Sequence, residues 1–152
     1  MRIIMRSKKF IFKLEAILKL RKFKEDDIKV ELGNTLKEIN EVNSNMEKID
    51  QQVEEIYKSQ TQLASSDISG QMLKFYPSFL QAKREEYKNK ENILKALYRK
   101  KDELIKKLAE AKGKTDIMTK LKAKEEKSFK KEKLKQDQLN IEELLQYKRI
   151  KT

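Results

Sequence analysis

The feature that most constrains this chain is a hydrophobic seam that repeats in alternating steps of four and three residues from Leu14 to Leu63 without a slip. Eleven of its fifteen positions are apolar. A spacing of 3.5 residues, kept over seven heptads, is typical of a supercoiled helix that needs a second apolar strip as its partner. The seam positions are Leu14, Leu18, Arg21, Glu25, Ile28, Leu32, Thr35, Ile39, Val42, Met46, Ile49, Val53, Ile56, Gln60 and Leu63.

A second, weaker seam follows an expected turn. Residues 64–70 are small and polar and end in Gly70, which predicts the end of a helix. Pro77 fits the first turn of a new helix, where its missing N–H has no partner to lose. The second seam is Leu80, Lys83, Tyr87, Lys90, Leu94, Leu97, Lys101, Leu104, Leu108, Ala111, Thr115 and Met118. We expect its stripe to be widened by Ile93, Tyr98, Ile105, Ile117 and Leu121.

These patterns predict an all-α fold, in which two long helices form an antiparallel coiled-coil hairpin. We expect a single domain over 1–152, with helix 1 at about 12–64, a turn at about 65–76 and helix 2 at about 77–149. Placing Leu63 beside Leu80 sets a register in which the numbers of facing residues add to about 143. That register predicts the contacts Met46–Leu97 and Leu32–Ala111 and the ion pairs Arg21–Glu125 and Glu25–Lys122.

The same register leaves about twenty C-terminal residues as a helical overhang, because helix 1 begins near Phe12, opposite about residue 131. Apolar side chains without an intramolecular partner usually mark an interaction site. In the overhang these are Leu134, Leu139, Ile141, Leu144, Leu145, Tyr147 and Ile150.

Charge is concentrated at the open end of the expected hairpin. Residues 1–24 have a net charge of +8 and residues 112–135 of +6, whereas the whole chain carries +12. The rest of the chain therefore totals −2, so the half of the hairpin nearer the turn is close to neutral. We therefore expect the open end to bind an acidic partner.

Composition argues against catalysis. The chain has no cysteine and no histidine, which removes thiolate chemistry, zinc–sulfur sites and the commonest general base. Adjacent carboxylates such as Glu142-Glu143 diverge by about 100° on a helix and cannot share a substrate. Residues 112–115, Lys-Gly-Lys-Thr, resemble the end of a phosphate-binding loop, but they lie inside the heptad pattern, where no such loop can form. We expect no catalytic, cofactor or metal site.

Other binding classes fit less well. A basic end can bind nucleic acid, but Phe75, Tyr76, Phe79 and Tyr87 lie toward the turn, away from most lysines, whereas single-strand binders interleave stacking and charge. The basic amphipathic tail allows at most peripheral membrane association. Met1–Phe10 has no continuous apolar run, so we expect a cytoplasmic protein; either Met1 or Met5 fits as the start.

Two segments resemble a known family. Residues 12–23, Phe-Lys-Leu-Glu-Ala-Ile-Leu-Lys-Leu-Arg-Lys-Phe, resemble the opening of FliJ, the flagellar type III export protein. Residues 108–111, a lysine-rich helix with Phe129, and residues 138–144 resemble that family's final helix, with Glu142-Glu143 in place of its common Asp-Glu. The resemblance covers nearly the whole length.

This resemblance implies an antiparallel coiled coil similar to the central stalk of rotary ATPases, inserted into the hexameric export ATPase FliI at the cytoplasmic face of the inner membrane. It also implies contact with the cytoplasmic domain of the export gate protein FlhA and handling of export chaperones. For ring binding we select Lys13, Arg21, Lys22, Leu139, Ile141, Leu144 and Leu145. For gate binding we select Tyr57, Tyr76, Phe79 and Tyr87. Core packing is the alternative role for Leu139, Ile141 and Tyr87, and a generic coiled-coil scaffold is the alternative function.

Overall fold

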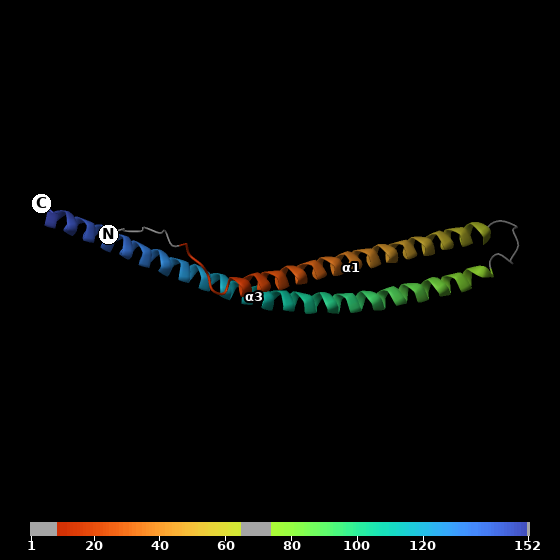
Figure 1. The fold of residues 1–152 in the computed structure, drawn as a ribbon. Helices are drawn as coiled ribbons and strands as arrows, with labels where there is room; N and C mark the ends of the chain where they lie inside the picture. Colours follow the sequence, from red (N-terminus) through yellow and green to blue (C-terminus); the bar gives the residue numbers. More distant parts are fainter. Residues whose placement is uncertain (1–8, 65–73, 152) are drawn as a thin grey trace. The chain divides into compact units, whose positions relative to one another are not determined.

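The protein is a helical hairpin built from two long helices that pack against each other. The structure, a computed structural model, describes residues 9–64 and 74–151. Helix α1 runs over Glu15–Ala64 and helix α3 over Phe75–Lys151, and the described residues contain no strand (Figure 1). The predicted fold class is therefore confirmed.

Helix α1 ends at Ala64, as predicted, and the other three helix boundaries differ from the predicted ones by two or three residues. Helix α1 begins at Glu15 rather than near Phe12, and its first turn is closed by the Glu15 N–H, which donates to the Phe12 carbonyl at 3.2 Å. Helix α3 begins at Phe75, so Pro77 lies within its first turn, as expected. Most of the predicted turn, residues 65–73, lies outside the described residues.

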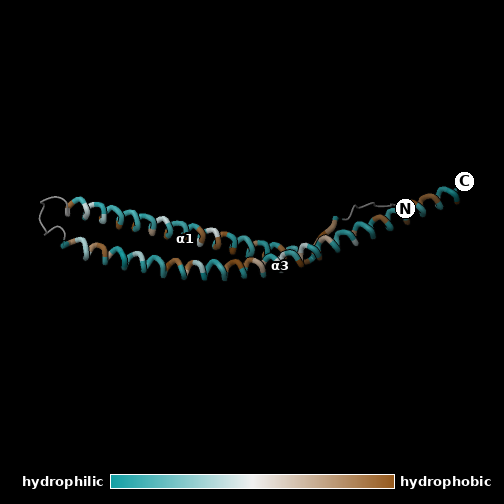
Figure 2. Tube along the Cα trace, turned by 180° about the vertical axis from the view of Figure 1, so that it is seen from behind, coloured by the Kyte–Doolittle hydropathy of each residue, from teal (hydrophilic) through white to brown (hydrophobic). Residues whose placement is uncertain are grey.

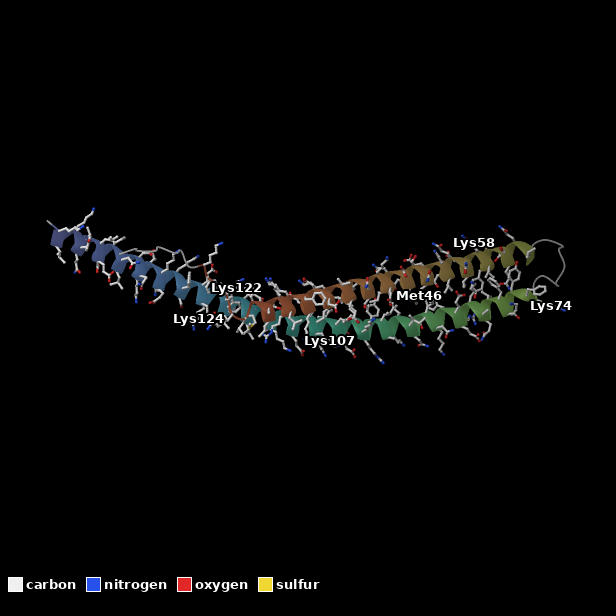
Figure 3. All side chains as sticks on the ribbon, viewed as in Figure 1. Met46, Lys58, Lys74, Lys107, Lys122 and Lys124 are labelled. Carbon is white, nitrogen blue, oxygen red and sulfur yellow. The ribbon has the colours of Figure 1, made fainter. Side chains whose placement is uncertain are left out.

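Burial follows the two seams. All fifteen positions of the first seam and all twelve of the second are buried or half-buried, whereas most residues between them are exposed. The hydropathy colouring in Figure 2 accordingly shows short apolar stretches set into mainly hydrophilic helices, and Met46 lies between the helices in Figure 3. The buried seam side chains are Leu18, Thr35, Ile39, Val42, Met46, Ile49, Leu104, Thr115 and Met118.

The expected widening of the second seam is wrong for four of its five residues. Leu121 packs against the buried cluster of Phe12, Leu18 and Met118. The side chains of Ile93, Tyr98, Ile105 and Ile117 stay exposed. The seam lysines Lys83, Lys90 and Lys101 are half-buried, consistent with aliphatic stems covering the core while the ammonium groups reach water.

The chain divides into two compact units. One, here called the terminal unit, comprises Met1–Asp26 and Ala109–Thr152, and the other, the loop unit, comprises Asp27–Leu108. In each unit a segment of α1 runs antiparallel to a segment of α3 (Figure 1). The terminal unit contains both ends of the chain, so the overhang and the basic segments belong to it.

The predicted register is wrong. In the terminal unit, Lys122 Nζ lies 2.9 Å from Glu15 Oε2, and the Arg21 guanidinium donates to the Lys114 carbonyl at 3.0 Å. The numbers of these pairs add to 137 and 135, and Leu18 and Met118, which share one buried cluster, add to 136. In the loop unit, Lys100 pairs with Glu31 at 4.0 Å.

In the terminal unit the observed register thus differs from the predicted one by about seven residues, which is one heptad. Neither predicted ion pair forms as expected, because Lys122 pairs with Glu15 and Arg21 contacts the Lys114 backbone. In the loop unit, Glu31 was expected near residue 112 rather than beside Lys100. The contacts Met46–Leu97 and Leu32–Ala111 were derived from the same incorrect register.

Candidate functional site

The last part of α3 presents a long, exposed apolar surface. From Lys130 to Lys151 every side chain except Asn140 is exposed, and Figure 3 shows side chains projecting to all sides of this segment. The predicted overhang is therefore present, and it begins just after Phe129. All seven predicted apolar residues are exposed, from Leu144 at 39% to Ile150 at 84%. Core packing is thus not the role of Leu139 or Ile141.

The basic residues selected for ring binding lie farther along the terminal unit. Lys13 and Lys22 are exposed and available to a partner. Arg21 is half-buried, and its hydrogen bond to Lys114 O joins the two helices, so part of its guanidinium is engaged within the hairpin. Lys114 and Leu139 are separated by 25 residues of one helix, which at about 1.5 Å per residue is roughly 35 Å. The seven ring-binding candidates therefore form two separate patches.

An aromatic contact closes the hairpin at the start of the overhang. The rings of Phe10 and Phe129 lie with centroids 5.6 Å apart and planes tilted by 51°. These two residues also line a shallow groove with Lys9, Lys122, Glu126, Lys130 and Lys133. The register predicted from sequence placed residue 131 beside Phe12, so this contact was missed.

Electrostatics at the open end centre on Glu15. The hydrogen bond from Lys122 is the largest cause that lowers the pKa of the Glu15 carboxyl below its ordinary value of 4.5, and the charges of Lys122, Lys19 and Lys22 act in the same direction. Desolvation opposes them. This acid is therefore held ionised within the basic surface and neutralises part of it.

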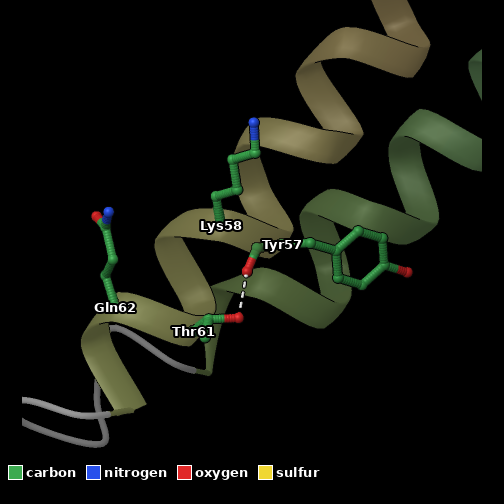
Figure 4. Close-up of a pocket in the computed structure, with 4 residues that line it drawn as sticks. All are labelled: Tyr57, Lys58, Thr61 and Gln62. Atoms are coloured by element: carbon green, nitrogen blue, oxygen red, sulfur yellow. Dashed lines mark hydrogen bonds between the residues drawn. The ribbon is translucent and has the colours of Figure 1, made fainter.

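The residues selected for gate binding all lie in the loop unit, but in different surroundings. Tyr57 and Phe79 are about half exposed, whereas Tyr76 and Tyr87 are half-buried, Tyr87 in the seam. The exposed part of Tyr57 borders an open groove with Lys58, Thr61 and Gln62, where the Thr61 hydroxyl donates to the Tyr57 carbonyl at 2.9 Å (Figure 4).

The ammonium group of Lys83 lies over the ring of Phe79. Lys83 Nζ lies 5.4 Å from the ring centroid and 3.3 Å from Glu86 Oε2. Tyr57 and Phe79 therefore present apolar area next to charge, whereas the position of Tyr87 is explained by packing.

The segment that resembles a phosphate-binding loop is helical. Residues 112–115 lie within α3, and the Thr115 hydroxyl donates to the Ala111 carbonyl at 3.0 Å. Their backbone is therefore not arranged as a cradle for a phosphate. Among residues 9–64 and 74–151, no three acidic or metal-ligating side chains cluster to hold a metal ion, and neither helix has an apolar stretch long enough to cross a membrane.

Comparison with known proteins assigns the family. The family model described as "Flagellar FliJ protein" matches residues 10–151, which is nearly the whole chain. No curated protein and no solved structure matches. The matched range includes both helices and the overhang. The chain belongs to the FliJ family, whose members are components of the flagellar protein export apparatus.

Proposed function

We propose that this protein is a non-enzymatic, central-stalk-like activator of the flagellar export ATPase ring FliI. In this proposal the terminal unit inserts into the ring, and the loop unit contacts the cytoplasmic domain of the export gate protein FlhA. The protein also handles export chaperones. It acts in the cytoplasm, at the face of the inner membrane where the flagellar base lies.

The observation that carries the ring proposal is the exposed overhang of the terminal unit. A single helix with exposed apolar side chains on all sides follows the two-helix segment. In this proposal that helix enters the hole of the ring and contacts it all round. Burying this apolar surface against a partner is favourable by about 25 cal/mol per Å². The basic side chains Lys13 and Lys22 would speed encounter with an acidic ring entrance.

The gate proposal is supported by the loop unit. Its exposed aromatic residues Tyr57 and Phe79 lie next to lysines, and aromatic side chains with an accessible face are favoured as interface anchors. Of the four selected residues, we therefore expect the contact to depend more on Tyr57 and Phe79 than on the half-buried Tyr76 and Tyr87.

The ring proposal is tested by titrating this protein into the ATPase of the same organism and measuring ATP hydrolysis at low and moderate salt. We expect stimulation that weakens with salt, because exposed charges are screened beyond about 8 Å at physiological ionic strength. The variant Lys13→Glu/Lys22→Glu should lower stimulation without lowering helicity. A matched charge reversal in the loop unit, Lys58→Glu, should leave stimulation unchanged.

Arg21 needs a second readout, since its guanidinium also joins the two helices. Arg21→Glu/Lys22→Glu is therefore compared with Lys22→Glu alone, with circular dichroism measured for both. Unchanged stimulation by all of these variants, with an ATPase shown to assemble, would favour the generic coiled-coil scaffold instead.

The gate contact is tested separately by binding of the isolated FlhA cytoplasmic domain. Tyr57→Ala and Phe79→Ala should each weaken binding, with ATPase stimulation retained. Tyr98→Ala removes an equally exposed tyrosine of the loop unit outside this set and is the matched control. If all three variants lost binding affinity equally, this would argue against a specific contact at Tyr57 and Phe79.

A further inference from the structure

A second exposed apolar surface lies on the side of the terminal unit. Ile17 and Leu20 of α1 are 43% and 53% exposed, and Ile117 of α3 is 64% exposed. Positions on the outside of a two-helix coiled coil normally carry charge. The sequence pattern did not select Ile17 or Leu20, and it expected Ile117 to widen the core. Within the described hairpin these three side chains stay exposed, so we look for a partner surface that would bury them.

The heptad positions place these residues on one side of the hairpin. With Leu18 and Met118 as facing core residues, Ile17 is at position g and Leu20 and Ile117 are at position c. Positions c and g adjoin on a helix, and the g positions of two antiparallel helices face each other on one side of the pair. The Glu31–Lys100 ion pair of the loop unit joins two such g positions. Ile17, Leu20 and Ile117 thus lie on one side of the α1–α3 pair, where the half-buried Leu121 also occupies a g position; this side is called the groove below.

Lysines border this groove. Lys24 of α1 and Lys114 of α3 occupy g positions, and Lys124 of α3 is at position c; all three are exposed. An occupant of the groove therefore needs an apolar face and acidic residues beside it. A third helix of that kind would complete a three-helix bundle.

The chain itself contains such a helix. Residues 136–147 of the overhang hold Asp137, Glu142 and Glu143 and no lysine or arginine, so this stretch has a net charge of −3 within a chain of +12. Leu134, Ile141, Leu144 and Leu145 fall on one helical face, at steps of seven, three and one residues. Asp137 shares that face, four residues before Ile141, and Glu142 borders it.

We propose that two copies of this protein pair through these surfaces, with the acidic overhang of each copy docked in the basic, apolar-lined groove of the other. The overhang cannot fold back onto its own groove, because the α3 side of the groove and the overhang are parts of one continuous helix. The overhang can dock in the groove of a partner copy if the two α3 helices run antiparallel. The arrangement is a two-fold dimer in which each copy contributes one groove and one overhang.

The lengths match this arrangement. If Ile141 of one copy faces Ile117 of the other, the two-fold axis passes near Phe129, midway between them. The exposed part of α3, residues 130–151, is about 33 Å long at about 1.5 Å per residue, so it runs along the partner from about residue 128 to about residue 107. Glu142 then lies within one helical turn of the partner's Lys114, and Asp137 within one turn of the partner's Lys124.

Charge sets the conditions in which pairing is observed. Each chain carries +12, so two copies repel at long range. At physiological ionic strength the screening length is about 8 Å, which weakens that repulsion while leaving contacts between adjacent opposite charges largely in place. Dimerisation should therefore be stronger at moderate than at very low salt, opposite to the salt dependence expected for ATPase stimulation.

The dimer does not depend on the proposed function, but it uses the same overhang. A copy whose overhang lies in its partner's groove cannot present Ile141, Leu144 and Leu145 to a ring. Self-pairing would thus cover the apolar overhang until the ATPase displaces the second copy.

Sedimentation equilibrium of the full chain, without ATPase, tests this directly. We expect the mass to rise with concentration from 18.1 kDa to twice that value and to stop there. A chain that stays monomeric up to millimolar concentration overturns the proposal. A mass that keeps growing overturns the reciprocal arrangement, because it indicates open head-to-tail chains.

Paired variants test the surfaces. Leu20→Asp in the groove and Ile141→Asp in the overhang should each weaken dimerisation at least tenfold, whereas Ile150→Asp, on the opposite face of the overhang, should not. All three side chains are exposed, so these substitutions should leave the fold intact. Circular dichroism of each variant measures whether its helicity is unchanged. Glu142→Lys and Lys114→Glu should each weaken the dimer, and combining both in one chain should restore it. Failure of the combined variant to recover would count against the pairing of these surfaces.

Because the chain has no cysteine, single introduced cysteines report the geometry. A mixture of Ile117→Cys and Ile141→Cys chains should form a disulfide-linked heterodimer on air oxidation. A mixture of Ile117→Cys and Ile150→Cys chains should form far less. Equal yields from the two mixtures would show random collision rather than the proposed dimer.

Discussion

At the level of single residues, the ion pair between Glu15 and Lys122 is the best-defined link between the two ends of the chain. Its atoms lie 2.9 Å apart, and both side chains are about one-third exposed. Solvent screens partly exposed pairs of this kind, so this pair contributes little to stability by itself. Glu15 is also the first residue of α1, where a carboxylate interacts favourably with the helix dipole.

This pair predicts a specific response to acid. The pKa of Glu15 is lowered in the folded protein, chiefly by the hydrogen bond from Lys122, so its contribution to stability is present above the unfolded value of about 4.5 and is lost as the pH falls through the lower folded value. Wild type should therefore exceed Glu15→Gln in stability at pH 7, and the difference should shrink below pH 4.5. Urea unfolding at a series of pH values measures it.

A matched control separates this pair from general charge effects. Glu125 is the partner that the incorrect register gave to Arg21, and its side chain is exposed. Glu125→Gln should change stability by less than about 0.5 kcal/mol at every pH. A larger effect at Glu125 than at Glu15 would support the other register.

At the level of the helices, the register of α1 against α3 can be tested in the unmodified protein. Carbodiimide joins a carboxylate to an amine only when the two are in contact. We expect a Glu15–Lys122 cross-link, because these atoms are within ion-pair distance. Mass spectrometry of the digested protein identifies the linked peptides. Recovery of Glu25–Lys122 in its place would indicate the register that lies one heptad away.

The helices also contain two glycines that cost stability. Gly33 and Gly113 lie in helix interiors, and a Cβ added at either would meet no neighbouring atom within 4 Å. Since glycine is less favourable than alanine in a helix by about 1 kcal/mol, Gly33→Ala and Gly113→Ala should each stabilise the protein by about that amount. Urea unfolding measures both, with Ala96→Gly, an exposed interior position of α3, as the reverse control.

At the level of the whole molecule, the overhang adds exposed surface rather than core. A chain that ends at Lys130 keeps Phe129 and every seam residue named above, so its thermal midpoint should fall by no more than about 4 °C. The same truncation should abolish ATPase stimulation. The full-length double variant Leu144→Asp/Leu145→Asp controls for chain length. If truncation unfolds the protein, the overhang has a structural role that its exposure does not indicate.

Much of this architecture could be predicted from the sequence. Leu18, Thr35 and Met118 are buried because the 3.5-residue spacing decides which side of a helix faces a partner, and that spacing is local information. The overhang and its exposed residues, Ile141 and Leu145 among them, followed from the unequal lengths of the two helices. The gate-binding and ring-binding roles of the selected residues stay predictions.

What only the tertiary structure decided is the register. Sliding one helix along the other by seven residues returns every seam residue to a seam position, so a heptad pattern permits both registers equally well. The choice depends on which side chains meet across the pair, as Lys122 meets Glu15 and Phe10 meets Phe129. These contacts join residues more than a hundred positions apart, and local periodicity carries no information about them. The groove formed by Ile17, Leu20 and Ile117 depends on the same choice, because it exists only where these residues of the two helices lie side by side.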